Sequence, residues 1–216
     1  MAKVLATCFE EVGTEIGVDE AGRGPMFGRV YTAAVILPRD LSLFDHTKMK
    51  DSKRFHSKSK IVETAEYIEK NAVAWSVTFE DEATIDRINI LQATQQSMHK
   101  SVRSVLRHCD VSDITIKILV DGNYFNPMEG LQHVCVEGGD NKYTAIAAAS
   151  ILAKVHRDRY IEEMCALHPE LIERYALDKN KGYGTREHMA GLTKYGPSPW
   201  HRRSFGCLKP KLKPEF

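Results

Sequence analysis

Acidic residues follow directly after two runs of alternating apolar residues, where they could act together on one reacting centre. The run EIGVD places its two apolar side chains on one side of an extended chain, so Asp19 points to the other side. In ITIKILVD the same alternation turns Asp121 away from the apolar side chains. Glu20 follows Asp19, and Asp140 lies in GGDNKY, before a run of small residues. Such a set of carboxylates could perform acid–base or metal chemistry.

Carboxylates that converge in one pocket need a cation, because several negative charges cannot stay ionised there together. Oxygen ligands without cysteine or histidine suit Mg²⁺ or Mn²⁺, and two such ions about 4 Å apart are the usual arrangement for attack on a phosphodiester. Each acid also has a plainer interpretation, because an aspartate at a strand end is often a turn residue and Asp140 could cap the next helix. The joint pattern favours the metal site.

A glycine-rich segment, GRGPMFG, occupies residues 22–28 directly behind the acidic pair. Its three glycines allow a tight loop whose backbone amides can approach a phosphate closely. It lacks the final Lys-Ser/Thr of a P-loop, so it does not predict that kind of nucleotide site. Taken alone, the segment is weak evidence for a ligand.

Two of the acids can meet only if their strands are neighbours that run in the same direction. No full helix separates the first two predicted strands, which indicates an antiparallel hairpin, whereas a long helix precedes the fourth, which can therefore be parallel to the first. Asp19 and Asp121 would then lie side by side beyond the strand ends, where open sheets bind ligands. The predicted strands are 15–18, 29–37, 73–79, 114–120 and 133–136. The predicted helices are one capped by Ser57, then 83–108, 143–164 and 186–194.

The charge is separated along the chain. The 216 residues are 43% hydrophobic and 27% charged, which excludes a disordered, collagen-like or membrane-embedded protein. The net charge of +1 alone argues against a nucleic-acid partner, but residues 174–216 carry +7 and the rest −6. A basic end indicates an anionic partner, although a solvated tail would give the same count. We expect one domain, with a catalytic core over 1–173 and a basic segment over 174–216 packed as part of it.

Cysteine usage and the N-terminus bear on location. The five cysteines are odd in number and form no C-x-x-C pair, so neither a disulfide framework nor a zinc site is predicted. The first fifteen residues are too polar for a signal peptide, and no apolar run approaches the ~18 residues of a membrane span. We therefore expect a cytoplasmic protein in a reducing compartment, with no membrane partner.

Several motifs together resemble the ribonuclease HII family, the type 2 ribonucleases H. They span about residues 15–206 and read GVDEAGRGPMFG, MKDSKRF, ILVDGNYF, GGDNKYTAIAAASILAKVHRDRY and NKGYGTREHMAGLTKYGPSPWHRRSF. The resemblance implies an α/β ribonuclease H-like fold, with a mixed five-stranded sheet of order 3-2-1-4-5, flanking helices and a small C-terminal helical segment. It implies an endonuclease that hydrolyses the RNA strand of RNA–DNA hybrids and nicks duplex DNA 5′ to embedded ribonucleotides. The products would carry a 3′-hydroxyl and a 5′-phosphate, and the roles would be ribonucleotide excision repair and RNA primer removal.

The resemblance also implies roles for individual residues. The expected catalytic residues, which bind two Mg²⁺ or Mn²⁺ ions, are Asp19, Glu20, Asp121 and Asp140. The expected substrate-binding residues are Gly22, Arg23, Gly24, Lys53, Arg157 and Tyr183. In the family, the glycine–arginine–glycine motif contacts the ribose 2′-hydroxyl, the tyrosine recognises the junction from RNA to DNA, and the two remaining basic residues match positions near the phosphates and the helix surface.

The sequence departs from the family at two points. His156 stands where threonine or serine usually precedes the Arg-Asp pair, and this is expected to alter a phosphate or packing contact without removing metal binding. The tail CLKPKLKPEF does not match the family's sliding-clamp peptide, so clamp recruitment is not expected. The expected partners are RNA–DNA hybrids and ribonucleotide-containing duplex DNA, bound by a monomer.

Two other functions compete with this one. A catalytically silent hybrid-binding module is disfavoured by the presence of all four acids. Another nuclease or an integrase of the same superfamily is disfavoured by the A-G-R-G and G-Y-G-T segments.

Overall fold

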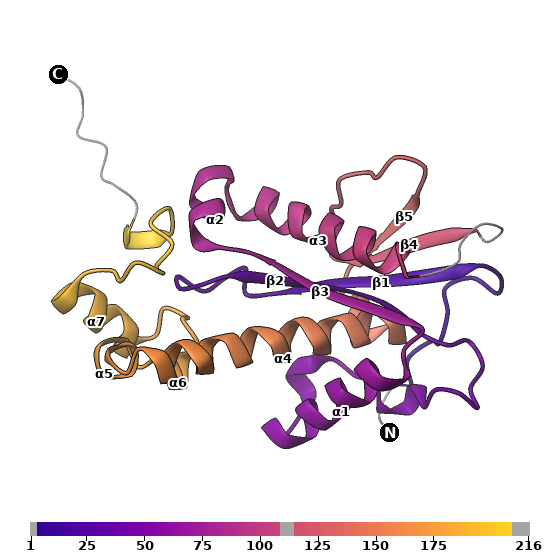
Figure 1. Cartoon of the computed structure of the whole chain (residues 1–216), viewed down its shortest axis with the longest axis horizontal. Coiled ribbons are helices and arrows are strands. Elements are labelled where there is room, and N and C mark those ends of the chain that lie inside the picture. Colours follow the sequence, from indigo (N-terminus) through magenta and orange to yellow (C-terminus); the bar gives the residue numbers. More distant parts are fainter. Residues whose placement is uncertain (1–3, 109–114, 209–216) are drawn as a thin grey trace.

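A five-stranded mixed sheet forms the centre of the protein, with helices on both of its faces (Figure 1). The computed structural model describes residues 4–108 and 115–208, apart from the side chain of Cys207. Cys109 and the tail beyond residue 208 therefore lie outside the described residues. The strand order is β3-β2-β1-β4-β5, which confirms the predicted fold class. The strands are β1 (Thr14–Ala21), β2 (Val30–Ile36), β3 (Ala74–Glu80), β4 (Ile116–Asp121) and β5 (Gln132–Val136).

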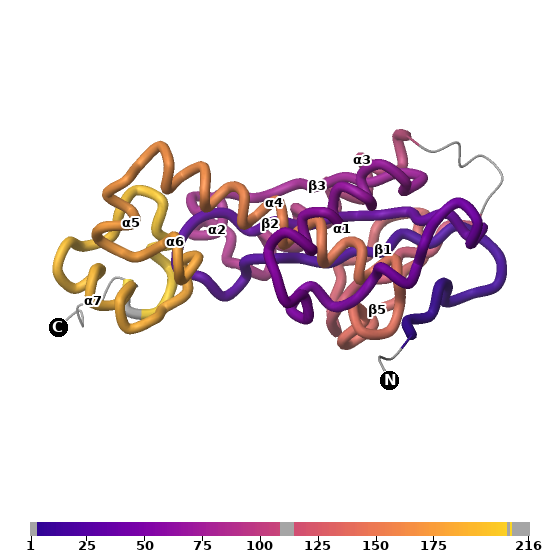
Figure 2. The backbone as a smooth tube through the Cα atoms, turned by 90° about the horizontal axis from the view of Figure 1, so that it is seen from below, coloured from indigo at the N-terminus to yellow at the C-terminus, as the bar shows by residue number. Residues whose placement is uncertain are grey.

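The helices form two layers and an end piece. α2 and α3 cover one face of the sheet and α1 and α4 the other, while α5, α6 and α7 gather at one end (Figures 1 and 2). Within the described part of the chain, no helix combines the length and the apolar character needed to cross a bilayer. The helices are α1 (Lys58–Asn71), α2 (Glu82–Ile88), α3 (Ile90–Leu106), α4 (Thr144–Leu167), α5 (Glu170–Tyr175), α6 (Leu177–Asn180) and α7 (Arg186–Tyr195).

Strand register brings the first two acids together. β1 pairs with β2 in antiparallel fashion and with β4 in parallel, as predicted. The parallel ladder ends with Val18 opposite Val120, so Asp19 and Asp121 both follow this last pair on the same side of the sheet. Pairing with β2 continues to Ala21, so Glu20 lies within the strand and not in a turn. β4 has already ended there, which leaves this part of β1 open at its edge.

The alternation in β1 divides the core into two layers. Ile16 and Val18 pack with Ile118 and Val120 under α3. On the other face, α4 lies so close to β1 that a Cβ atom on Gly17 would overlap the carbonyl group of Ala145. The alanine-rich first half of α4 permits this approach, because small side chains let a helix settle directly on a sheet. The same helix carries Ser150, Lys154 and Arg157 to the carboxyl ends of β1 and β4.

Residues 83–108 do not form the single predicted helix. The chain breaks at Asn89, whose φ of 66° places it in the left-handed region, and its side chain accepts a hydrogen bond from the Gln92 amide to begin α3. Asparagine is a strong helix cap, so the break follows from a local property that apolar periodicity does not report.

The C-terminal segment packs on the loop that follows β1. Met26 and Phe27 from that loop form one apolar cluster with Leu171, Tyr175 and other residues of the end piece. Phe27 also pairs with His201 in an isolated antiparallel bridge. The division into a core over 1–173 and a basic segment over 174–216 stays a prediction.

Candidate active site

A cavity of about 410 Å³ opens at the carboxyl ends of β1 and β4, where the sheet meets the C-terminal segment. Nine of the ten site residues expected from the sequence line it. The tenth, Asp140, lies in a short 3₁₀ turn before α4 and is near enough to Asp121 for that carboxylate to raise its pKa. Asp140 does not cap α4, whose N-cap is Tyr143. The nine are Asp19, Glu20, Gly22, Arg23, Gly24, Lys53, Asp121, Arg157 and Tyr183.

Burial, and after it the charge of neighbouring carboxylates, raises the pKa values of Asp19, Glu20 and Asp140. Burial, then the charges of Glu20 and Asp121, holds the pKa of Asp19 well above its usual value. Burial also raises the pKa of Glu20, against the opposing effect of Arg23. Burial followed by repulsion from Asp121 raises the pKa of Asp140, while Lys53 opposes it. A cation placed among these groups would reverse each repulsion.

The donor set fits a hard divalent cation, but the oxygens have protein partners as they lie. Asp121 Oδ1 accepts from the Gly139 amide at 2.7 Å, and Asp140 Oδ1 accepts from Asn141 Nδ2 at 3.1 Å. Glu20 Oε1 binds Arg23 at 3.3 Å. Accordingly, among the described residues no three acidic, histidine or cysteine side chains are arranged to hold an ion. Occupation by Mg²⁺ or Mn²⁺ would require side-chain rotation, with carboxylate oxygens as the ligands that these ions prefer.

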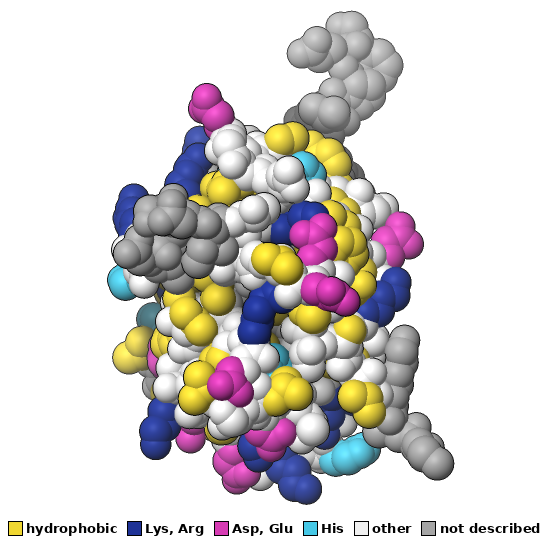
Figure 3. Space-filling view, turned by 90° about the vertical axis from the view of Figure 1, so that its right-hand side faces the viewer, with side chains coloured by type: hydrophobic (Ala, Val, Ile, Leu, Met, Phe, Trp, Pro, Cys, Tyr) yellow, Lys and Arg dark blue, Asp and Glu magenta, His cyan; other side chains and the backbone are white. Residues whose placement is uncertain are grey.

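Basic groups line the same cavity as the acids. Lys53 follows Asp51, whose carboxylate accepts from the Lys53 amide at 2.9 Å and starts a 3₁₀ turn. Lys154 also lines the cavity and donates to Asp158 at 2.8 Å. By contrast, basic and acidic side chains are interspersed on the end of the molecule away from α7 (Figure 3). The cavity therefore places cationic groups where a phosphate could meet them.

Tyr183 and Arg157 form the outer wall. Tyr183 is 48% exposed, and the centroid of its ring lies 5.8 Å from the guanidinium carbon of Arg157. Arg157 is only 1% exposed and donates to the Lys181 carbonyl at 2.6 Å, while its Nε has no partner among the described residues. Arg157 thus lies beneath the tyrosine and does not present its charge on the helix surface.

Four lining residues were not expected from the sequence, and two of them, Ser150 and Lys154, come from α4. They project from the same face of α4 as Arg157, at spacings of four and three residues. Ser150 also lies 3.1 Å from the hydroxyl of Ser52. A search for polar residues at helical spacing within AAASILAKVHRD would have found them. His156 faces elsewhere and binds Glu69 of α1 at 2.8 Å, so the expected packing change falls outside the cavity.

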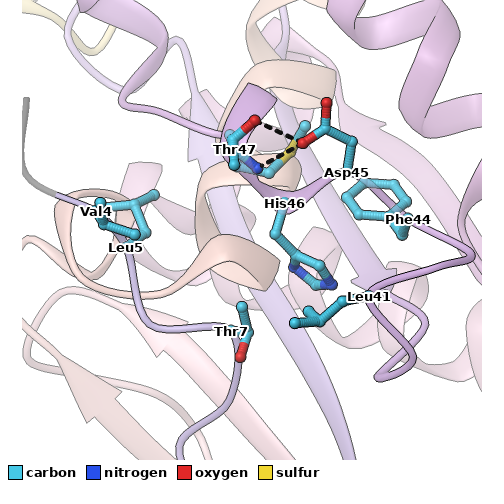
Figure 4. Close-up of a pocket in the computed structure, with 9 residues that line it drawn as sticks. Val4, Leu5, Thr7, Leu41, Phe44, Asp45, His46 and Thr47 are labelled. Carbon is cyan, nitrogen blue, oxygen red and sulfur yellow. Dashed lines mark hydrogen bonds between the residues drawn. The ribbon is translucent and has the colours of Figure 1, made fainter.

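A larger cavity, of about 560 Å³, lies between the N-terminal segment and the 38–49 loop (Figure 4). Its walls are mainly apolar, from Leu5, Leu41 and Phe44. His46 has both ring nitrogens engaged, with Thr144 and with the Pro38 carbonyl, each at 2.9 Å. The ring nitrogens of His46 are thus satisfied within the protein. The residues that line this second cavity include no cluster of carboxylates comparable to the one at the ends of β1 and β4.

A chain of histidine hydrogen bonds holds the backbone of Tyr183. The Ser198 amide donates to His201 Nδ1 at 2.9 Å, so in the neutral ring the proton is on Nε2. This Nε2 donates to His188 Nε2 at 2.9 Å, which leaves the His188 proton on Nδ1. That group donates to the Tyr183 carbonyl at 2.9 Å. Both imidazoles must be neutral for the chain to exist.

We expect this pair to make the fold sensitive to acid. Burial, followed by the charge of His188, lowers the pKa of His201 to about 3, and burial lowers that of His188. Below a pH of about 6.5 the unfolded chain takes up these protons and the folded chain does not, so stability falls as the pH falls towards the folded pKa. His201 should contribute about 1.4 kcal/mol per pH unit in that window. Urea unfolding of the native protein and of His201→Gln from pH 7 to pH 4 should give a smaller slope for the variant, and equal slopes would refute the assignment.

Comparison with known proteins agrees with the geometry. Residues 16–207 match the family model described as ribonuclease HII. The chain is 42% identical over 194 residues to ribonuclease HII of Bacteroides thetaiotaomicron, covering 90% of each chain. It is 41% identical over 207 residues to ribonuclease HII of Cytophaga hutchinsonii, covering 96% of each.

Solved structures agree as well. The ribonuclease H2 of Pyrococcus horikoshii superposes with a TM-score of 0.66 at 25% identity, over 89% of this chain and 93% of that one. The Archaeoglobus fulgidus structure of a PCNA:RNase HII complex gives 0.69 at 23% identity, over 92% and 98%. Bst-RNase HIII in complex with Mn²⁺ gives 0.63 at 17% identity, over 85% and 71%. The last two likenesses concern the fold alone.

Proposed function

Because the chain belongs to the ribonuclease HII family, we propose that it nicks duplex DNA on the 5′ side of an embedded ribonucleotide by a two-metal-ion mechanism. As a member of this family it is a metal-dependent endonuclease with ribonuclease H activity on RNA–DNA hybrids. The observation that carries the proposal is a single cavity that joins three of the acids, the glycine-rich loop and Tyr183. Ribonucleotide excision repair and primer removal are the roles that this activity would serve.

The four acids would hold the ions, with Asp19 and Asp121 at the centre because they lie side by side at the strand ends. Bound Mg²⁺ or Mn²⁺ would lower the pKa of the attacking water and neutralise charge on the phosphate. The Mn²⁺ in complex with Bst-RNase HIII concerns that protein, and it supports a divalent ion in the shared fold. Lys53 and Lys154, which line the same cavity, would bind phosphate oxygens.

The glycine-rich loop and Tyr183 would select the substrate. A 2′-hydroxyl distinguishes RNA from DNA at one nucleotide, and the backbone amides of Gly22, Arg23 and Gly24 can reach it without a bulky side chain between. The exposed face of Tyr183 is free to stack on the next sugar or base. Hydrolysis of the phosphodiester that precedes the ribonucleotide releases a 3′-hydroxyl and leaves a 5′-phosphate.

A labelled duplex with one ribonucleotide tests the proposal. With Mg²⁺ or Mn²⁺ the protein should produce one nick, 5′ to the ribonucleotide, and should leave an all-DNA duplex of the same sequence intact. Asp121→Asn should bind the duplex without cutting it, because it removes one ligand charge while preserving shape. Absence of a nick with binding intact would instead identify a silent binding module, and equal cutting of both duplexes would identify a nuclease of another specificity.

Tyr183 should contribute through its ring and not through its hydroxyl. Stacking of a base on an aromatic side chain contributes about 1–3 kcal/mol, so Tyr183→Ala should lower kcat/KM on the single-ribonucleotide duplex by about 5- to 150-fold, and Tyr183→Phe should lower it little. Tyr195→Ala is the matched control, because Tyr195 is 46% exposed but lies at the end of α7, away from the cavity lining. A change of less than twofold in Tyr183→Ala would contradict the stacking role.

The remaining expectations concern location and partners. The cytoplasmic location, the monomeric state and the absence of clamp recruitment stay predictions. The PCNA complex in the Archaeoglobus fulgidus structure concerns that protein. Size-exclusion chromatography with light scattering would test the monomer directly.

A further inference from the structure

Arg202 is a fully buried arginine whose guanidinium donates all of its hydrogen bonds to one loop. Its exposed fraction is 0%, and its guanidinium donates to four backbone carbonyls of the glycine-rich loop. The acceptors are Gly22 at 2.7 Å, Arg23 at 3.1 Å, Pro25 at 2.7 Å and Gly28 at 2.7 Å. Its own amide donates to the Met26 carbonyl at 2.8 Å. One residue thus holds five carbonyls of a seven-residue loop.

These contacts orient the amides on the other side of the loop. In a trans peptide, the carbonyl of one residue and the N–H of the next point in opposite directions, and the peptides of this loop are trans. The carbonyls of Gly22 and Arg23 point at Arg202, so the N–H groups of Arg23 and Gly24 point away from it. The peptide between Pro25 and Met26 shows the same opposition. Its carbonyl accepts from Arg202, whereas its N–H points the other way and donates to the Gly182 carbonyl at 2.8 Å.

The two amides are free to bind a ligand. Neither the Arg23 nor the Gly24 N–H donates to any residue that the structure describes. Both residues line the cavity that contains Asp19 and Asp121. Two adjacent donors with a fixed direction form a small site for an oxygen atom.

Only an arginine can hold the loop in this way. Its planar fork offers five N–H donors with fixed directions, whereas lysine offers three from a single atom. Burial, then the charge of Arg157, lowers the pKa of Arg202 to about 9, so the guanidinium remains charged at neutral pH.

We propose that Arg202 is a positioning residue for substrate selection: it fixes the peptide planes of the glycine-rich loop so that the Arg23 and Gly24 amides bind the ribose 2′-hydroxyl. The inference rests on the proposed function, because it needs a ribonucleotide at the cavity. Arg202 itself does not touch the substrate. It therefore controls the difference in affinity between ribose and deoxyribose and not the affinity for duplex as such.

The test measures that difference directly. In an Asp121→Asn background, which suppresses cleavage, dissociation constants are measured for a duplex with one ribonucleotide and for the same all-DNA duplex. The unaltered loop should prefer the ribonucleotide by about tenfold or more, the value of one well-placed hydrogen bond. Arg202→Lys should bring the ratio of the two dissociation constants to within about twofold of one and leave the affinity for the all-DNA duplex unchanged.

Arg39→Lys is the matched control. Arg39 also holds backbone carbonyls, those of Glu10 and Glu11 at 2.9 and 2.8 Å, but it follows β2 at the opposite end of the sheet. Arg39→Lys should therefore leave the ratio of the two dissociation constants unchanged. Thermal melting of each variant establishes that it is folded, and Arg202→Gln replaces Arg202→Lys if the latter does not melt cooperatively.

The outcomes separate the two proposals. Equal affinity of the Asp121→Asn protein for the two duplexes would refute the proposed selection of a ribonucleotide. A large parent ratio that persists in Arg202→Lys would overturn the role of Arg202 and leave the proposed function intact. An equal fall in the affinities for the two duplexes, or loss of cooperative melting in both Arg202→Lys and Arg202→Gln, would make Arg202 a general structural residue and overturn the inference.

Discussion

Asp19→Asn is expected to abolish cleavage of the single-ribonucleotide duplex and at the same time to stabilise the fold. Loss of a central ligand charge should lower kcat/KM by at least about 10³-fold, equivalent to about 4 kcal/mol of transition-state stabilisation. The gain in stability has a separate cause. Asp19 is 4% exposed, and burial, followed by repulsion from Glu20 and Asp121, disfavours its charge in the folded state.

Asparagine removes that charge and keeps the local hydrogen bond. Asp19 Oδ1 accepts from the Glu20 amide at 2.6 Å, and an asparagine oxygen can do the same. In EDTA the melting temperature should therefore rise by about 2–4 °C, the shift that about 1 kcal/mol produces in a chain of this size. Added Mg²⁺ should raise the melting temperature of the native protein more than that of the variant, because the ion binds the folded state.

Asp40→Asn is the control for this prediction. Asp40 is exposed, and hydrogen bonds from Ser42 lower its pKa, so its charge is favoured in the folded state. The same substitution there should not raise the melting temperature and should leave cleavage unchanged. A fall in the melting temperature of Asp19→Asn, or retained cleavage, would refute the picture of a strained carboxylate cluster.

The carboxylate pair could be predicted from sequence because two strong periodic rules determine its position. Alternation in a strand decides which side chains face the core, and the long helix before β4 permits parallel pairing with β1. These two facts place Asp19 beside Asp121, as the register confirms. The same reasoning failed at Asn89, where one residue with a positive φ divides a helix whose apolar stripe continues across the break.

The support for the substrate loop could not be predicted in this way. Arg202 bonds to carbonyls about 180 positions earlier in the chain, and a carbonyl acceptor carries no residue-type signal. Its burial depends on the C-terminal segment folding back over the loop between β1 and β2. In the sequence, HRRSF therefore resembles a basic surface stretch, although one of its two arginines has no exposed area. Part of the basic character that indicated an anionic partner is thus structural.

Gly22→Ala is the second substitution with a large expected effect, because two separate constraints act on this position. The φ of Gly22 is 93°, which an alanine adopts only with strain, and an added Cβ would collide with Arg157 Nε and lie 2.6 Å from its Cδ. Either the loop or the guanidinium must move. A displacement of about 1 Å at a reacting centre can cost about 10²-fold, so kcat/KM should fall by about that factor.

Gly130→Ala separates strain from collision. Gly130 also has a positive φ, of 73°, but nothing lies within 4 Å of an added Cβ, and it precedes the amino end of β5, away from the cavity. It should lower stability by about 1 kcal/mol and leave kcat/KM unchanged. A comparable loss of activity in Gly130→Ala would show that strain alone explains the result for Gly22.

A double-mutant cycle between Gly22→Ala and Arg157→Ala then tests the collision itself. If the new methyl group acts by displacing Arg157, removal of the guanidinium should cost less activity in the Gly22→Ala protein than in the native one, because the guanidinium is already out of place there. The two effects on kcat/KM should therefore be less than additive. Strict additivity would mean that the loop and Arg157 act independently, and it would assign the loss in Gly22→Ala to the backbone alone.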